Sequence, residues 1–220
     1  MVRIEYEKRK AFAHSMSAEE IERRILSLDN REYRVILALT FLTMSRISEI
    51  CTLRKGDVSA WEFQGKDYLL LAIGVEKRGG FAKLYPLVQE KSFRKLYLDV
   101  VGYLKETSKG DPDAWLWKDP KVFTYTRELK LKNGEVKILT ETDNLLRKRI
   151  GKYSKSHIKL NPHLLRHARY AILDWIYGLT EHQLQSVGGW KREEDMRVYR
   201  RYARPEELAR SLLRKPIYAH

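Results

Sequence analysis

The spacing of hydrophobic residues divides the first part of the chain into helical segments. Ser17 is followed three residues later by Glu20, a pairing typical of a helix start in which each side chain can bind a backbone amide of the other residue. We therefore predict a helix from Ser17 to about Leu28. Apolar residues then recur at helical spacing over 32–44, and this pattern predicts a second helix.

The pattern changes after residue 57, where continuous apolar runs replace the helical spacing. One run covers Tyr68–Val75 and a shorter one covers Lys83–Val88, with Gly79 and Gly80 between them. Short apolar runs separated by glycines predict a β-hairpin. Beyond it we expect a helix over 92–105 and a turn at 133–134, without an assignable function for this middle part.

The last third again has the pattern of helices. Three pairs of polar or proline residues mark their starts: Thr140 with Asp143, Asn161 with Pro162, and Thr180 with Gln183. Glycines at positions 151, 178, 188 and 189 are expected to close or separate these helices. The predicted fold class is therefore mostly α with a small antiparallel β-sheet (α+β), in one compact domain.

The charge balance narrows the class of partner. Lysine and arginine total 43 against 29 acidic residues in 220, a formal net charge of +14. Such an excess suits a polyanion, with nucleic acid as the first candidate, although a charge-rich soluble protein from a hot environment has a similar composition. The single cysteine, Cys51, lies among apolar residues and is expected to be a buried thiol.

The sequence contains neither a membrane-spanning run nor a signal-peptide core. No window reaches the uninterrupted apolar length that a membrane span needs, and the basic N-terminus runs into AFAHSMS without an apolar core. We therefore expect no membrane partner. The expected location is the cytoplasm, in association with the nucleoid, for a protein encoded by a cell, a virus or a mobile element.

Four separated signatures suggest the chemistry of phosphate transfer. They are Arg46 in RISEI, His163 and Arg166 in HLLR, Trp190 in GGW, and Tyr199. The planar guanidinium of arginine matches the non-bridging oxygens of a phosphodiester, and two of them can stabilise charge that other enzymes assign to metal ions. A tyrosine hydroxyl can then attack phosphorus and store the cleaved bond as a phosphotyrosine. This chemistry needs neither metal nor ATP, and we expect no cofactor.

These signatures resemble those of a known family. RISEICTLRKGDV resembles the first-arginine box of the tyrosine recombinases, which include the phage-type integrases and the dimer-resolving recombinases, and HLLRHARYAIL resembles their second box. In that family a helix of about the length of 174–187 leads to a glycine followed by histidine or tryptophan, and the nucleophilic tyrosine lies nine residues further. Here Gly189 and Trp190 precede Tyr199 at that interval. The resemblance covers about residues 17–203.

The resemblance implies a role for each of six residues. Arg46 and Arg166 would bind the scissile phosphate, and Tyr199 would attack it to leave a 3′-phosphotyrosine and a free 5′-hydroxyl. Lys77, at the hairpin turn, would donate a proton to the departing oxygen. His163 would assist proton transfer or phosphate binding, and Trp190 would hydrogen-bond or pack beside the phosphate.

Other interpretations of these residues remain open from the sequence. Arg46 could form an ordinary helix ion pair with Glu49. His163 and His167 have the spacing of metal ligands, but no third ligand stands at a useful distance in the sequence. The nearby Tyr202 competes with Tyr199 as nucleophile. Arg78 and Lys83 compete with Lys77, although a lysine is the better acid because its pKa falls more readily near a desolvated site.

The family pattern also implies a division of the chain. Residues 1–16 form a basic extension, 17–204 the catalytic domain and 205–220 a C-terminal helix or tail that packs on its own domain or on a neighbouring protomer. The helical core-binding domain that usually precedes the first box is expected to be absent. The sequence departs from the family pattern at two places. Thr43-Met44-Ser45 lacks the glycine usually seen before the first arginine, and Gly188 stands where a leucine usually precedes the glycine of the third box.

The expected function is that of a site-specific DNA recombinase of the integrase or excision type. It would act on double-stranded DNA as a homo-oligomer, a tetramer, through a tyrosyl intermediate. Two alternatives remain: a type IB topoisomerase, which shares this chemistry but relaxes supercoils, and a basic DNA-binding module that keeps the fold without the reaction.

Overall fold

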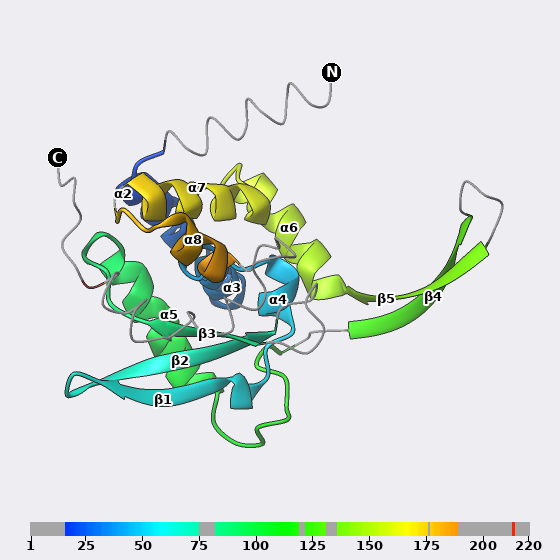
Figure 1. The fold of residues 1–220 in the computed structure, drawn as a ribbon, viewed down its shortest axis with the longest axis horizontal. Helices are drawn as coiled ribbons and strands as arrows, with labels where there is room; N and C mark the ends of the chain where they lie inside the picture. The colour runs from blue at the N-terminus through cyan, green and yellow to red at the C-terminus, as the bar shows by residue number, and fades with distance from the viewer. Residues whose placement is uncertain are drawn as a thin grey trace.

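The computed structural model describes residues 16–74, 82–118, 122–130, 136–175, 177–188 and 213. Within them the chain is mostly helical with a small antiparallel sheet, as predicted (Figure 1). The helices are α2 (Ala18–Leu26), α3 (Arg31–Leu42), α4 (Ile47–Cys51), α5 (Arg94–Thr107), α6 (Leu145–His157), α7 (Pro162–Trp175) and α8 (Glu181–Gly188). The strands are β1 (Val58–Phe63), β2 (Lys66–Gly74), β3 (Ala82–Leu87), β4 (Val122–Lys130) and β5 (Val136–Asn144), with short 3-10 turns at Lys55–Asp57 and Lys91–Phe93.

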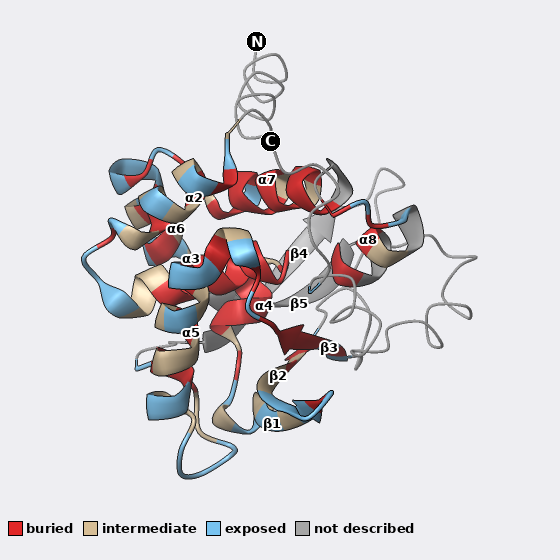
Figure 2. Cartoon of the chain, turned by 90° about the vertical axis from the view of Figure 1, so that its left-hand side faces the viewer, coloured by how far each residue is buried: buried red, intermediate tan, exposed pale blue. Residues whose placement is uncertain are grey.

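Helix α3 forms the centre of the hydrophobic core. Every residue from Val35 to Leu42 is buried, so this part of the helix is covered on all sides by other elements. Phe41 packs edge-on against Phe93, with ring centroids 5.0 Å apart. Figure 2 shows buried positions concentrated in α3, α4 and α7. The predicted burial of Cys51 is confirmed, since its thiol is free and inaccessible.

The first predicted helix is confirmed, although one detail of its start differs. The Ser17 hydroxyl accepts a hydrogen bond of 3.1 Å from the Glu20 amide, as expected. The Glu20 carboxylate turns instead to Arg23 and Arg24, with a bond of 2.6 Å to Arg24 Nε. These cations lower the pKa of Glu20, with Arg24 the larger cause. The Glu20 carboxylate therefore binds charged side chains on the next turn of the helix in place of the Ser17 backbone amide.

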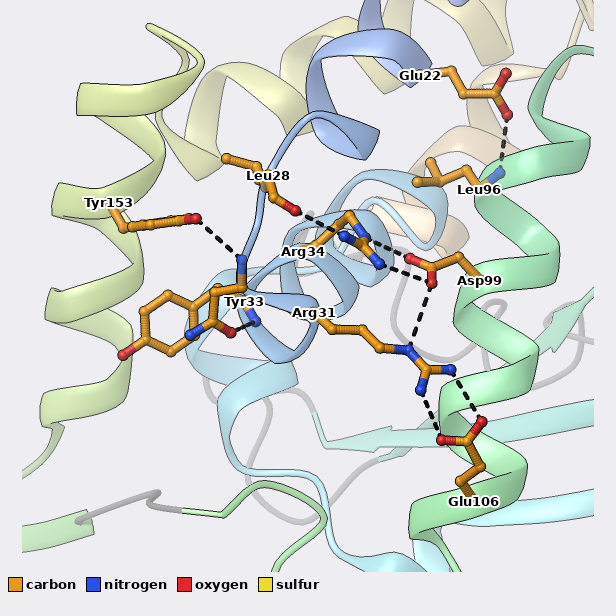
Figure 3. Close-up of polar contacts among 10 residues, drawn as sticks. Glu22, Leu28, Arg31, Tyr33, Arg34, Leu96, Asp99, Glu106 and Tyr153 are labelled. Atoms are coloured by element: carbon orange, nitrogen blue, oxygen red, sulfur yellow. Dashed lines mark hydrogen bonds and ion pairs between the residues drawn. The ribbon is translucent and has the colours of Figure 1, made fainter.

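Ion pairs fasten α3 to α5 at the edge of the core. Arg34 binds Asp99 through two donors, at 2.7 and 3.1 Å, and donates a further bond to the Leu28 carbonyl (Figure 3). Arg31 reaches Glu106 on the same face of α5, at 2.8 and 3.1 Å. These contacts fix the long axis of α5 against α3.

The predicted hairpin is confirmed, and the described sheet contains one further strand. Strands β2 and β3 pair antiparallel, with Leu71 opposite Tyr85. Strand β1, which was not predicted, pairs with the other edge of β2 to give the order β1-β2-β3. Gln64 and Gly65 make the β1–β2 turn, and both have positive φ angles, as two-residue hairpin turns require.

The prediction of a helix start at Thr140 and Asp143 is wrong. Residues 136–144 form strand β5, which pairs with β4 from Val122 opposite Asn144 to Lys130 opposite Val136. The two strands make a separate ribbon that extends away from the helical body (Figure 1). The expected turn at 133–134 lies outside the described residues. Helix α6 begins only at Leu145, and Gly151 lies inside it rather than at its end.

The starts of the last two helices are confirmed. The Asn161 side chain accepts from the Leu164 amide at 2.8 Å, one turn into α7. Thr180 and Gln183 exchange bonds at the start of α8, where the Thr180 amide donates to Gln183 Oε1 at 2.9 Å. Gly178, with φ 59°, lies between the helices. The interval 174–187, which has about the length of the family's connecting helix, is divided here, because α7 ends at Trp175 and α8 begins at Glu181.

No helix in the described ranges is both long enough and apolar enough to span a membrane.

Candidate phosphate-binding site

Three of the six predicted site residues lie in the described part of the chain. Arg46, His163 and Arg166 are described, and their elements, α4 and α7, both border α3. Lys77, Trp190 and Tyr199 lie outside the described residues, as do the competing residues Arg78 and Tyr202.

Arg46 stands at the start of α4, in the turn that follows α3. Its backbone amide donates to Glu49 Oε2 at 2.7 Å and its Nη1 donates to Glu49 Oε1 at 2.8 Å. The expected ion pair is therefore present, but it is not an ordinary surface pair. The Glu49 side chain is only 3% exposed, against 26% for Arg46. The buried Glu49 carboxylate thus holds the Arg46 guanidinium on its protein side, and part of the guanidinium remains open to solvent.

Arg166 lies in the second turn of α7 and is buried, at 6% exposure. Its Nη2 donates to the carbonyl of Gly188, the last residue of α8. The pKa of Arg166 falls to about 10, first because the group is buried and second because the positive charge of Arg46 lies near; Glu49 acts in the opposite direction. The two arginines from separate boxes are therefore neighbours.

Lys83, which the sequence offered as one of three hairpin candidates, is also part of this site. Its ammonium is buried and donates to the Thr43 carbonyl at 2.8 Å, to Ser45 Oγ at 2.7 Å and to the Val187 carbonyl at 2.6 Å. The pKa of Lys83 falls to about 7, chiefly because the ammonium is buried; Glu49 opposes the fall, and Arg166 and Arg46 contribute to it. An ammonium has three N–H groups, so these three acceptors use all of its donors.

Arg46, Lys83, Arg166 and Glu49 together form what we call the cation cluster. Three cations and one carboxylate meet in it, and the effect of each arginine on the pKa of Lys83 shows that they share one electrostatic environment. Holding like charges together in a region of low dielectric is unfavourable unless an anion joins them. The chemistry of the cluster therefore favours a bound anion, and the guanidinium groups favour the oxygens of a phosphate.

His163 lies one turn before Arg166 on α7. Its side chain is exposed, and its Nε2 lies 3.1 Å from Nε2 of His167 on the following turn. The two rings meet edge to face with centroids 4.6 Å apart. No group of three or more histidine, cysteine or acidic side chains with metal-binding geometry occurs among the described residues. An imidazole at this position can exchange protons with solvent and with its neighbour.

A buried ion pair beneath the site was missed by the sequence reasoning. Arg169, on the turn of α7 after Arg166, is fully buried and binds Glu90 through Nη1 at 2.8 Å, and its Nε donates to the Leu42 carbonyl at 3.2 Å. The Tyr85 hydroxyl donates to the same carbonyl at 2.7 Å. The available signal was the position of Arg169 between Leu165 and Ile172, on the apolar stripe of α7.

Helix α6, which precedes α7 in the chain, carries a set of exposed cations. Lys148, Lys152 and Lys155 are exposed, and their spacing of four and three residues places them along one face of the helix. Arg149, also exposed, lies beside this row. We call Lys148, Lys152 and Lys155 the α6 basic row. It offers a second region of positive potential in the described structure, in addition to the cation cluster.

A scan of protein-family models found no match to the chain. Among curated proteins, the chain is 26% identical over 159 residues to tyrosine recombinase XerA from Pyrococcus horikoshii, a stretch that covers 72% of this chain and 47% of that protein. The chain is therefore similar in sequence to a tyrosine recombinase over most of its length.

Among solved structures, the chain matches a complex described as the XerH site-specific recombinase bound to difH substrate in a pre-cleavage state. The TM-score is 0.48 at 16% identity, covering 87% of this chain and 50% of that one. The chain thus spans about half the length of both recombinases.

Proposed function

We propose that this chain is the catalytic part of a site-specific DNA recombinase, which cleaves and rejoins double-stranded DNA through a 3′-phosphotyrosine intermediate. The observation that carries the proposal is the cation cluster. It brings Arg46 and Arg166, from two motifs 120 positions apart in the sequence, into one electrostatic environment suited to a phosphate. The relationship to the tyrosine recombinases supports the same activity.

In the proposed reaction, the guanidinium groups of Arg46 and Arg166 bind the non-bridging oxygens of the scissile phosphate. Charge on these oxygens grows as the phosphorus is attacked, so donors already held in place lower the barrier. Glu49 keeps the Arg46 guanidinium oriented, and the Gly188 carbonyl does the same for Arg166. A guanidinium carries five N–H donors in a planar fork, so one group can bind the protein and a phosphate at the same time.

The covalent step is assigned to Tyr199. Its phenolic oxygen forms a bond to phosphorus, the bond from phosphorus to the 5′ oxygen breaks, and the phenolic proton passes to a base for which His163 is the candidate. The departing 5′ oxygen takes a proton from Lys77, and Trp190 packs or hydrogen-bonds beside the phosphate. Religation reverses these steps with a new 5′-hydroxyl, so no metal or nucleotide is consumed.

The geometry of Lys83 supports the choice of Lys77 over it as proton donor. All three N–H groups of Lys83 point to acceptors within the protein, and burial separates the ammonium from solvent. A general acid must reach the oxygen that it protonates and recover a proton afterwards. The proton donor is therefore sought among the other hairpin residues, Lys77 and Arg78.

The α6 basic row supports binding along the DNA backbone. Lysines spaced along one helical face can neutralise successive phosphates without reading bases. The row lies on the helix that leads into α7, which carries His163 and Arg166. We propose that several protomers, four in the complete assembly, bind one recombining pair of sites in this way.

A suicide substrate tests the reaction class and the nucleophile together. A nicked DNA duplex that loses its 5′-hydroxyl fragment on cleavage should trap the wild-type protein as a covalent complex on a denaturing gel. Tyr199→Phe should abolish this band, and Tyr202→Phe should retain it. Arg166→Lys should reduce cleavage strongly, because a point charge cannot replace the two-donor fork.

Other outcomes assign the chain to a different function. DNA binding without any covalent band would indicate a DNA-binding module that keeps the fold without the reaction. Covalent trapping at many unrelated sequences, with relaxation of supercoiled plasmid, would indicate a type IB topoisomerase activity. Loss of the band in Tyr202→Phe alone would move the nucleophile to Tyr202.

A further inference from the structure

The Lys83 ammonium joins two chain segments that each lead directly into the proposed phosphate site. Thr43 and Ser45 belong to the turn between α3 and α4, and Ser45 is the residue immediately before Arg46. Val187 belongs to the end of α8, and the next residue, Gly188, accepts the hydrogen bond from Arg166. One side chain from β3 therefore connects the supports of both arginines.

Two cations share the C-terminal end of α8. Lys83 binds the Val187 carbonyl and Arg166 binds the adjoining Gly188 carbonyl. The last carbonyls of a helix have no partner within the helix and carry the negative end of its dipole, so cations are favoured there. The end of α8 is thus fixed from two directions, by strand β3 and by helix α7. The chain continues from this point toward Trp190 and Tyr199.

We propose that Lys83 is a positioning residue, which holds the α3–α4 turn and the end of α8 at the separation that lets Arg46 and Arg166 act on one phosphate. This inference rests on the proposed function for its effect on catalysis. Lys83 acts through other residues and touches neither the DNA nor the reacting atoms.

The location of Lys83 argues for this role over simple packing. A buried ammonium is costly, and an apolar residue of similar size at position 83 would satisfy the core at less cost. Its three acceptors come from two segments far apart in the sequence, and each segment adjoins an arginine contact. The charged groups that face it are Glu49, Arg46 and Arg166, all members of the cation cluster. Strand β3 thus places the Lys83 ammonium between the two segments that support the site arginines.

The first test separates binding from cleavage. Lys83→Met should slow covalent trapping of bound suicide substrate by about tenfold to a hundredfold, because small displacements of catalytic groups are this costly. DNA affinity should change less than about threefold, since the α6 basic row and the arginines remain. Lys105→Met, at an exposed position on α5, should match the wild type in both measurements. Ser45→Ala, which removes one of the three acceptors, should slow cleavage in the same direction but less.

Two results of this test would overturn the proposal. One is a wild-type cleavage rate in folded Lys83→Met. The other is an equal loss of affinity and cleavage, which would make Lys83 a DNA ligand.

The second test needs no reaction. Backbone hydrogen exchange of the free protein should become faster in Lys83→Met, or more mildly in Ser45→Ala, at both residues 44–51 and residues 181–188, with α5 unchanged. Unchanged exchange at either segment would overturn the proposed connection. If the wild type forms no covalent complex at all, the recombinase assignment fails by itself, and hydrogen exchange still decides the role of Lys83.

Discussion

Arg169 and Glu90 form a two-point ion pair inside the core, one turn of α7 beyond the site residue Arg166. Arg169 Nη1 lies 2.8 Å from Glu90 Oε2, a second bond joins the other two atoms, and the side chains are 0% and 3% exposed. Arg169 is three residues after Arg166 on α7, and its Nε binds the last residue of α3, Leu42. The pair therefore fixes α7 to α3 and to the segment after β3, on which the positions of both site arginines depend.

Loss of the Glu90 charge should destabilise the protein severely. Glu90→Gln leaves a buried guanidinium without its counter-charge, which typically costs about 3–5 kcal/mol. Urea unfolding monitored by circular dichroism would measure the difference. Glu106→Gln, which removes the exposed partner of Arg31, should have a much smaller effect. Similar losses in the two variants would contradict the importance assigned to the buried pair.

The stability of the protein should rise with pH in a way that depends on Lys83. Its pKa is about 7 in the folded state and close to the ordinary 10.5 in the unfolded chain. Between these values the unfolded chain binds a proton that the folded protein has released, so raising the pH favours folding. We expect the free energy of unfolding to increase from pH 7 to pH 10 more in the wild type than in Lys83→Met. Equal pH dependence in both proteins would contradict this assignment.

Neutralising the α6 basic row should weaken DNA binding without sequence preference. Replacing Lys148, Lys152 and Lys155 by glutamine should reduce the slope of log affinity against log salt by about 0.9 for each lysine that contacts a phosphate. Fluorescence anisotropy at several salt concentrations, on specific and random duplexes, measures this slope. A control triple variant at Lys66, Lys91 and Lys105, exposed positions on other elements, should keep the wild-type slope. Equal slopes in the two triple variants would exclude α6 as the contact.

Met44 offers a test of backbone strain next to the site. Its φ of 52° lies in the left-handed region that glycine favours, in the turn where the family pattern has a glycine, and its side chain is fully buried. Left-handed geometry costs about 1–2 kcal/mol, whereas truncating a buried methionine costs about 2–5 kcal/mol. Met44→Gly should therefore still destabilise the protein.

The comparison with alanine isolates the backbone contribution. Met44→Ala loses nearly the same contacts but keeps the strain, so Met44→Gly should be at least as stable in thermal unfolding. Greater stability of the alanine variant would show that the turn does not favour glycine.

The parts of the site that follow from local chemistry could be predicted from the sequence. Arg46 and Arg166 were proposed from the motifs RISEI and HLLR, which resemble those of a known family, and α7 begins at the predicted Asn161 cap. The role of Lys83 was less evident because it depends on which face of β3 turns inward. The alternation of Lys83, Tyr85 and Leu87, all buried, was the available signal.

The wrong prediction at Thr140 has a similar origin. A threonine followed three residues later by an aspartate suits a helix start, but threonine also suits a strand, and pairing with β4 decides between them. Such pairing joins residues up to 22 positions apart, from Val122 to Asn144, and a local motif carries no information about it. The buried pair of Arg169 and Glu90, 79 residues apart, was missed for the same reason.

The ribbon of β4 and β5 has a practical consequence. Its strands are matched residue for residue from Val122 and Asn144 at the base to Lys130 and Val136, and it points away from the helices (Figure 1). Whole cross-strand pairs can therefore be added or deleted while Trp117, which precedes β4, and Leu146, which follows β5, keep their buried places in the core. This makes the ribbon the preferred position for splicing in a fluorescent or affinity peptide, because the label would then lie away from the hydrophobic core and the cation cluster.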